Sequence, residues 1–132
     1  MEETFYFLTA GDIISIHDSA IKEYGGPPGL RDYGLVESAA GAPKATYEGK
    51  YLMGLFEMAA TYAVSISMNH PFIDGNKRTA ALAATIFLYM NGYLLHEGHD
   101  EELANTILEI IDHKIDKTAL TEYFTRNCKI IE

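Results

Sequence analysis

Residues 59–88 read A-A-T-Y-A-V-S-I-S-M-N-H-P-F-I-D-G-N-K-R-T-A-A-L-A-A-T-I-F-L, and they hold two strongly apolar segments on either side of a short polar one. Both apolar segments predict helices: residues 51–69 repeat apolar side chains at helical spacing, and residues 76–90 are apolar almost all round. Pro71 cannot continue a helix in the normal pattern. We therefore expect two central helices joined by a polar loop that the core anchors. The predicted buried stripe of the first helix comprises Leu52, Leu55, Phe56, Ala59, Tyr62, Ala63 and Ile66.

Four further helices are predicted outside this pair, each from apolar spacing and a capping residue. The first also starts with a capping box formed by Thr9 and Asp12. Between the second helix and the central pair, residues 44–49 predict an irregular segment or a short hairpin. The fold class is thus an all-α bundle of about six helices, with one domain over residues 1–132. The outer helices are expected over residues 9–24, 33–40, 100–111 and 117–128, with Asp32, Asp100 and Asp116 as N-caps of the last three.

Composition narrows the classes of function. Ten basic against nineteen acidic residues give a formal net charge of −9, which argues against nucleic-acid binding through the overall field. A single cysteine, Cys128, excludes an intrachain disulfide and a cysteine-based metal cluster. No apolar stretch reaches the about 20 residues that span a membrane, and the acidic N-terminus is unlike a secretory leader. We expect a soluble cytoplasmic protein without membrane contact, whose ligands are small molecules or other proteins.

The polar segment, residues 70–78, is called the motif loop here, and its end carries two cations. Lys77 and Arg78 lie in the first turn of the predicted helix, where the helix dipole is already positive and cations are unfavourable. Free backbone N–H groups at Gly75-Asn76 add to the positive potential. Cations at such a place are explained by a bound anion, so this helix start predicts a phosphate site.

The start of the motif loop carries groups suited to acid–base and metal chemistry. The neutral imidazole of a histidine such as His70 can accept a proton near neutral pH. Asp74 offers a hard oxygen ligand, and Mg²⁺ typically takes one or two carboxylates and completes its shell with phosphates and water. A base, a metal carboxylate and a phosphate site within nine residues predict phosphoryl or nucleotidyl transfer.

The motif loop, His70-Pro71-Phe72-Ile73-Asp74-Gly75-Asn76-Lys77-Arg78, resembles the signature of the Fic/Doc (Fido) superfamily. The Fic pattern is H-x-F-x-[D/E]-G-N-G-R-x-x-R, whereas that of the Doc (death-on-curing) branch is H-x-F-x-D-[A/G]-N-K-R, which matches here. Residues 25–39, G-G-P-P-G-L-R-D-Y-G-L-V-E-S-A, and residues 87–93, F-L-Y-M-N-G-Y, are also similar to Doc-type sequences. The resemblance implies the Fido fold, a helical bundle with a short flap before the central helices.

The resemblance also implies roles for individual residues. His70 would be the general base that deprotonates a target hydroxyl, Phe72 the core anchor of the loop, and Asp74 the Mg²⁺ ligand or the group that orients the acceptor. The remaining residues would bind nucleotide phosphates: Gly75 and Asn76 as an anion nest, and Lys77 and Arg78 as cations. The segment in the position of the family's target-aligning flap comprises Lys44, Ala45, Thr46, Tyr47, Glu48 and Gly49.

Two departures from the Fic pattern bear on the reaction. Lys77 replaces the second Gly, which adds bulk and charge where a backbone would approach a pyrophosphate closely, and Ala81 replaces the second Arg. In the Doc branch this accompanies transfer of the γ-phosphate of ATP, so the resemblance favours a protein kinase acting on a Ser or Thr hydroxyl, with Mg²⁺. The implied target is a translation elongation factor of the Tu type. The alternatives are a Fic-type adenylyltransferase and a catalytically silent binding module.

The resemblance further implies how the activity is restrained. Some Fic proteins carry an inhibitory [S/T]-x-x-x-E-[G/N] helix, and neither Glu48-Gly49 nor Glu97-Gly98 fits it. A toxin of this kind would need a separate antitoxin, as in Phd–Doc-type pairs.

Three other sites are read as structural. Arg31 is expected to be a surface neighbour of the capping Asp32, and His17 a partly buried histidine at the edge of an apolar stripe. His96 and His99 are expected in a solvated acidic loop.

Overall fold

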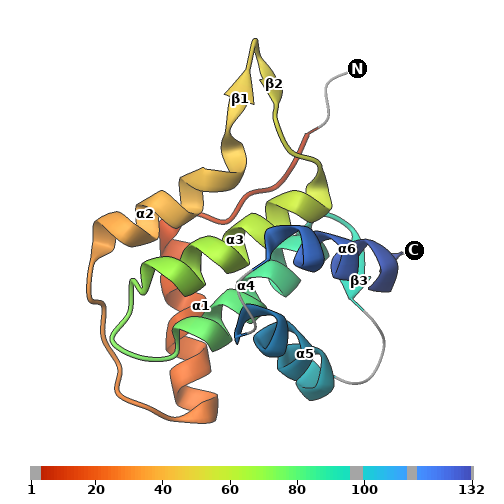
Figure 1. Ribbon diagram of the computed structural model, residues 1–132. Coiled ribbons are helices and arrows are strands. Elements are labelled where there is room, and N and C mark those ends of the chain that lie inside the picture. The colour runs from red at the N-terminus through yellow and green to blue at the C-terminus, as the bar shows by residue number, and fades with distance from the viewer. Residues whose placement is uncertain (1–3, 96–99, 113–115, 132) are drawn as a thin grey trace.

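The computed structural model describes residues 4–95, 100–112 and 116–131 and confirms an all-α bundle with short strands (Figure 1). The helices and strands in chain order are α1 (Ala10–Tyr24), α2 (Tyr33–Gly41), the 3-10 turn η1 (Ala42–Lys44), β1 (Thr46–Tyr47), β2 (Lys50–Tyr51), α3 (Leu55–Asn69), α4 (Asn76–Met90), β3 (Tyr93–Leu95), α5 (Asp100–Asp112), α6 (Lys117–Asn127) and β4 (Cys128–Ile130).

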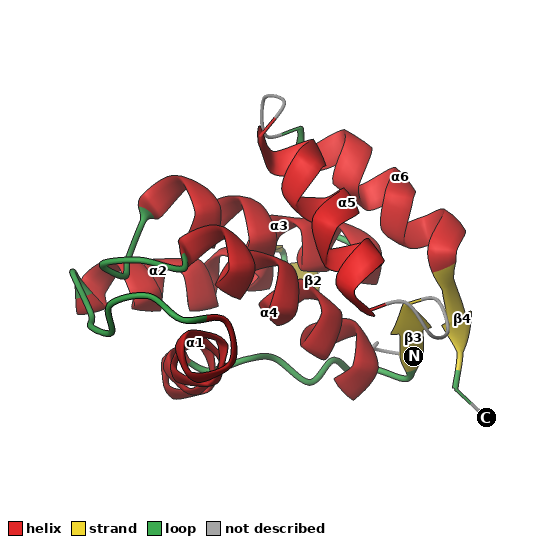
Figure 2. Cartoon of the chain, turned by 90° about the horizontal axis from the view of Figure 1, so that it is seen from below, coloured by secondary structure: helices red, strands yellow, loops and turns green. Residues whose placement is uncertain are grey.

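The core is built around α3 and α4, as the sequence predicts. Small side chains of both helices are fully buried where the two pack, which allows their axes to approach closely. Helices α1 and α5 pack on α4, while α2 and α6 pack on α3. Figure 2 shows α1 on one side of α4 and the α5–α6 pair on the other. The fully buried alanines of α3 and α4 are Ala59, Ala60, Ala63, Ala80, Ala83 and Ala84.

The predicted start of α3 is wrong by four residues. Instead of entering the helix, Tyr51 pairs with Thr46 in the β1–β2 hairpin, and the backbone N–H of Leu52 donates to the Ala45 carbonyl at 2.9 Å. Gly54 is the N-cap of α3. Leu52, predicted to be buried, is 62% exposed because it belongs to the hairpin.

Residues 44–49 were expected to form an irregular segment or a short hairpin. A hairpin is found, but it spans Thr46 to Tyr51. Lys44 ends η1, and the second strand continues to Tyr51. Glu48 (φ 50°) and Gly49 (φ 79°) form its two-residue turn with positive φ, the geometry that matches the twist of paired strands.

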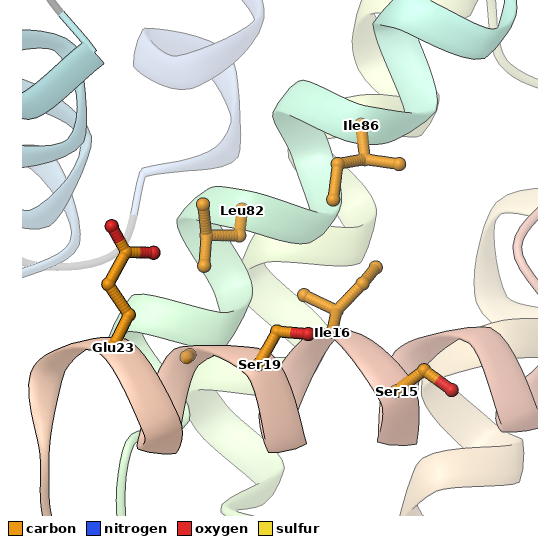
Figure 3. A pocket seen from close by; sticks show the side chains of 7 residues that line it. Ser15, Ile16, Ser19, Glu23, Leu82 and Ile86 are labelled. Carbon is orange, nitrogen blue, oxygen red and sulfur yellow. The ribbon is translucent and has the colours of Figure 1, made fainter.

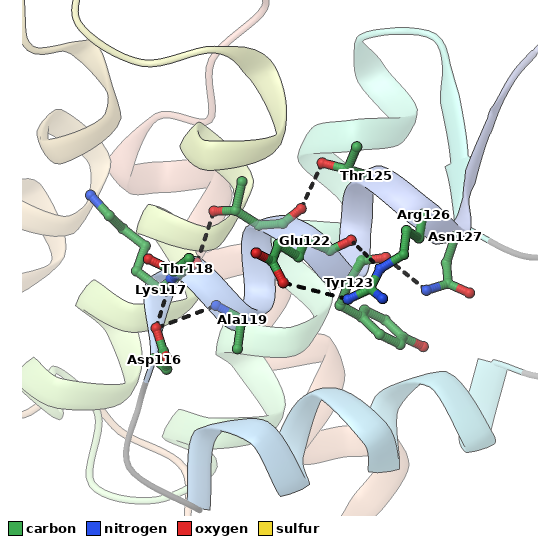
Figure 4. A network of polar contacts seen from close by, with 10 residues as sticks. Asp116, Lys117, Thr118, Ala119, Glu122, Tyr123, Thr125, Arg126 and Asn127 are labelled. Atoms are coloured by element: carbon green, nitrogen blue, oxygen red, sulfur yellow. Dashed lines mark hydrogen bonds and ion pairs between the residues drawn. The ribbon is translucent and has the colours of Figure 1, made fainter.

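The capping predictions for α1, α2 and α6 are confirmed. Thr9 and Asp12 form the capping box of α1, and Asp32 accepts from the Leu35 backbone N–H at 3.3 Å. Figure 4 shows the start of α6, where Asp116 accepts from two backbone N–H groups. The backbone of Asp100 is described as the start of α5, but its side chain is not, so its expected capping role stays a prediction.

The β3–β4 pair was not predicted. Leu94 lies opposite Lys129 in this antiparallel pair, which ends α6 at Asn127 and ties the C-terminal segment to the end of α4. Pairing between residues so far apart in sequence leaves little local signal. Among the described residues, no helix has the length and apolarity needed to cross a membrane.

Candidate active site

Two left-handed residues shape the motif loop between α3 and α4. His70 is the C-cap of α3 with φ 49° and ψ 56°, and Gly75 is the N-cap of α4 with φ 77° and ψ 17°. Left-handed backbone is uncommon outside glycine and tends to occur where surrounding structure enforces it, often at functional sites. The exposed side chain of His70 is thus held at the turn that leaves α3.

A second backbone segment, residues 29–32, runs against the motif loop and fixes it. The Ile73 N–H donates to the Gly29 carbonyl at 3.1 Å, and the Arg31 N–H donates to the Pro71 carbonyl at 2.8 Å. Leu30 and Phe72 form an isolated antiparallel bridge. This segment belongs to residues 25–39, which resemble Doc-type sequences, and its backbone contacts hold the motif loop in place.

Arg31 is more than the surface neighbour that the sequence predicted. Its Nε donates to the His70 carbonyl at 2.6 Å, and its terminal nitrogen donates to the Asn69 carbonyl at 2.8 Å. The C-terminal carbonyls of a helix lack intrahelical partners and carry partial negative charge, so a guanidinium stabilises them. Arg31 thereby braces the backbone of His70 in its left-handed conformation.

Phe72, for which the resemblance implied the role of core anchor, is buried, with 2% of its surface exposed. The Asn76 amide bonds both ends of the Phe72 backbone unit, accepting from its N–H at 3.0 Å and donating to its carbonyl at 2.9 Å. The Asn76 side chain is therefore engaged within the loop. An anion at this helix start would be bound by backbone N–H groups rather than by the Asn76 amide.

The two cations of the motif loop lie in different surroundings. The Lys77 ammonium pairs with the Asp112 carboxylate of α5, and both side chains are half exposed. The Arg78 guanidinium lies over the Tyr24 ring, 4.2 Å from its centroid. Arg78 Nη1 is buried and has no hydrogen-bond partner among the described residues. A buried charged donor without a partner is costly, and none of the described residues satisfies this nitrogen, so it is a candidate for binding a ligand acceptor.

The backbone N–H groups at the start of α4 also lack a side-chain cap among the described residues. Gly75 offers no side chain to cap the helix, and no side-chain cap bond is found there within the described part of the chain. The free N–H groups of the first turn add to the Arg78 donor as an anion-binding surface.

Asp74 is exposed, and its carboxylate lies directly against the backbone of Gly26. A Cβ added to Gly26 would lie 2.5 Å from Asp74 Oδ2, whereas a Cβ on Gly25 would meet nothing within 4 Å. The Asp74 side chain therefore depends on a position without a side chain at residue 26.

This contact predicts that Gly26→Ala displaces Asp74 and lowers activity. Gly25 and Gly26 both have positive φ, 87° and 109°, so alanine strains the backbone at either position by about 1–3 kcal/mol. Gly25→Ala is thus the matched control for strain without the contact. We expect similar melting temperatures for the two variants but a lower turnover for Gly26→Ala, measured with purified proteins. Equal turnover would show that Asp74 does not depend on Gly26.

The residues of the expected flap do not lie beside the motif loop. In Figure 1 the β1–β2 hairpin projects beyond the start of α3, whereas the motif loop follows its other end. A helix of 15 residues is about 22 Å long. Although Lys44, Ala45, Thr46, Tyr47, Glu48 and Gly49 form the expected hairpin region, the structure does not bring them together with His70.

Two surface hollows lie away from the motif loop. One, of about 270 Å³, is bordered by Ile16 and Ala20 of α1 and by Leu82 and Ile86 of α4 (Figure 3). The other, of about 360 Å³, lies between α5 and α6. Neither of these two hollows is lined by residues 70–78.

Sequence reasoning missed the two residues that hold the motif loop, Arg31 and His17. His17 is fully buried, and its ring stacks on Phe72, so the expectation of partial burial is wrong. The sequence signal for the burial of His17 was its position four residues after Ile13, on the apolar face of α1. His96 and His99 lie outside the described residues.

Comparison with known proteins identifies the family of the chain. The sequence profile of the Fic/DOC family matches residues 7–88. Over 119 residues the chain is 34% identical to "Protein kinase doc" of Escherichia phage P1, covering 90% of this chain and 93% of the relative. Over 102 residues it is 38% identical to "Toxin Doc" of Mycolicibacterium smegmatis, covering 76% and 72%. Profile and relatives agree with the signature in residues 70–78, and the chain therefore belongs to the Fic/Doc family, in its Doc branch.

Proposed function

We propose that this chain is a Doc-type toxin that transfers the γ-phosphate of ATP to a Ser or Thr hydroxyl of a protein target. The observation that carries the proposal is the buried, unpartnered Nη1 of Arg78 beside the uncapped start of α4. The names of both relatives, a protein kinase and a toxin, support the same reading.

A phosphate group would satisfy the donors that have no partner among the described residues. Phosphate oxygens accept from backbone N–H groups at a helix start and from a guanidinium at once. Lys77 adds a third positive group, because its partner Asp112 lies on another helix and the half-exposed pair can exchange a carboxylate oxygen for a phosphate oxygen. The proposed phosphate ligands are the first-turn backbone from Gly75 and Asn76 onward, with Lys77 and Arg78.

Asp74 suits a magnesium ion that is shared with phosphates. Among the described residues no three His, Cys, Asp or Glu side chains gather to hold a metal, so a metal bound at Asp74 would need further ligands from the substrate or from water. Mg²⁺ commonly binds one or two carboxylates and completes its octahedral shell with substrate phosphates and water. When bound, Mg²⁺ supplies neutralisation of charge on the phosphate oxygens.

His70 is the proposed general base. Its exposed imidazole takes the proton of the target hydroxyl, whose oxygen forms a bond to the γ-phosphorus. The bond from that phosphorus to the β–γ bridging oxygen breaks, and ADP leaves. Arg31 and the left-handed backbone hold His70 while Arg78 and the α4 start hold the phosphates, so catalysis consists mainly of positioning and charge stabilisation.

The identity of residues 77 and 81 favours γ-phosphate transfer over transfer of AMP. Ala81 is 1% exposed in the core of α4, so this chain has no cation at the place of the second Arg of the Fic pattern. Lys77 fills the position where Fic sequences have glycine.

Lys77→Gly restores the Fic-like Gly-Asn-Gly-Arg and is expected to weaken γ-phosphate transfer, because one phosphate-binding cation is lost. Loss of one charge-assisted contact at a transferring phosphoryl group typically costs about 10²-fold. The products are identified by mass spectrometry of the target protein. Asp112→Asn is the matched control, since it removes the same ion pair and keeps the lysine. An unchanged rate and product for Lys77→Gly would show that Lys77 is only a surface cation.

We further propose that a translation elongation factor of the Tu type is the target and that a separate antitoxin of Phd type restrains the chain. The target is tested by incubating the purified factor with this protein, ATP and Mg²⁺, and measuring its intact mass. A gain of one phosphate supports the proposed target, and an unchanged mass in the presence of an active preparation contradicts it. For the antitoxin, we expect a small reading frame adjacent to the one that encodes this chain. Co-expression of its protein product should rescue growth, and that product should co-purify with this chain.

A further inference from the structure

The buried histidine of α1 contacts the motif loop from the side opposite to solvent. His17 is 1% exposed, and its ring lies parallel to that of Phe72, with 3.8 Å between centroids and 3° between planes. Its Nε2 lies 2.7 Å from the Asp74 carbonyl oxygen. A carbonyl can only accept, so Nε2 carries the hydrogen and donates it.

This hydrogen bond acts at the residue that precedes the left-handed Gly75. A Cβ added to Gly75 would lie 3.2 Å from Ile21 Cδ1 and 3.6 Å from His17 Nε2. One face of α1 is thus the surface on which the turn into α4 rests, with Ile21 supplying packing and His17 the directional contact. The carbonyl that His17 binds belongs to the same residue whose carboxylate is the candidate metal ligand.

We infer that His17 is a positioning residue, whose Nε2 hydrogen bond to the Asp74 carbonyl fixes the Asp74–Gly75 peptide and thereby aligns Asp74 and the phosphate-binding turn. The inference rests on the proposed function for its catalytic consequence. A purely structural histidine would contribute through its volume and ring stacking, whereas a positioning residue contributes through the donor. The two roles can be separated because different side chains preserve each one.

Two replacements at position 17 and one control make this separation. His17→Phe keeps a ring beside Phe72 but has no donor for the Asp74 carbonyl. His17→Gln loses the ring but keeps an N–H donor on a side chain of similar reach. Ile13→Val, one turn earlier on the same buried face, perturbs the core of α1 without changing any donor.

Of the two variants at position 17, the one with the higher melting temperature is expected to have the lower kcat. His17→Phe should lower kcat about tenfold or more, because a small misplacement of catalytic groups costs about this much. His17→Gln should restore most of kcat although its melting temperature is the lower of the two. If kcat instead follows the melting temperature across the three variants, the inference is overturned.

Amide hydrogen exchange gives a readout that does not depend on the reaction. The Phe72 and Ile73 N–H groups, bonded to Asn76 and to Gly29, report on the order of the motif loop. Both should exchange about tenfold faster in His17→Phe than in Ile13→Val. Equal exchange in the two variants contradicts the inference even if the wild type is active. If the wild type transfers no phosphate, the proposed function fails, and the exchange comparison alone decides the role of His17.

Discussion

Replacing His70 by alanine is expected to abolish phosphate transfer and growth inhibition while the fold is retained. His70 is the only imidazole in the motif loop, and removing a positioned general base typically costs about 10²–10⁴-fold in rate. Its side chain is exposed at the end of α3, so the core loses nothing. Transfer is measured with purified protein, and growth inhibition is measured by expression in cells.

A second variant at this position separates loss of the base from backbone strain. His70 has φ 49°, a conformation that asparagine tolerates better than alanine. His70→Asn should therefore be as inactive as His70→Ala but closer to the wild type in melting temperature. Near-native toxicity of either variant would refute the assignment of His70 as the base.

Replacing Arg78 by alanine is expected to have the second large effect, a fall in transfer of about 10²-fold or more, because a preorganised donor to a charged transition state is removed. The variant should fold, since the wild-type Nη1 has no protein partner to lose within the described residues. Loss of the contact with Tyr24 removes some packing only. Rates at saturating ATP and the KM for ATP are both measured.

Two comparisons make the Arg78 result specific. Arg78→Lys keeps the charge but lacks the planar fork that binds phosphate through two nitrogens, so it should recover only part of the activity. Arg126→Ala removes an exposed cation that pairs with Glu122 on α6, and it should leave transfer unchanged (Figure 4). Similar losses for Arg78→Ala and Arg126→Ala would indicate a general effect of charge instead of a phosphate site.

The central helices were predictable because their signals are local. The spacing of apolar residues gives α4 its predicted bounds, and α3 ends at Asn69, before Pro71, as predicted. The start of α3 was mispredicted because Leu52 continues the apolar spacing of the helix. Only the pairing of Tyr51 with Thr46 across the hairpin turn shows that the chain is still extended there.

The chemical groups of the motif loop could be predicted from the sequence, but the residues that hold the loop in place could not. A base, a carboxylate and two cations within nine residues can be recognised from residue types alone. The braces come from elsewhere in the chain: Arg31 reaches the His70 carbonyl, and His17 lies 57 positions before the Asp74 carbonyl that it binds. Burial and hydrogen bonding between distant residues depend on tertiary packing, which a single sequence does not display. The same holds for the Asp112 partner of Lys77 and for the unpartnered nitrogen of Arg78.

The position of the label transferred from ATP distinguishes γ-phosphate transfer from transfer of AMP. Wild-type protein and His70→Asn are incubated with a cell lysate, Mg²⁺ and ATP labelled either at the γ- or at the α-phosphorus. We expect that a protein of the lysate retains the γ label with the wild type, that the α label is not retained, and that His70→Asn transfers neither. Retention of the α label would identify an adenylyltransferase, and retention of neither label by the wild type would identify a binding module; either result would contradict the proposed γ-phosphate transfer.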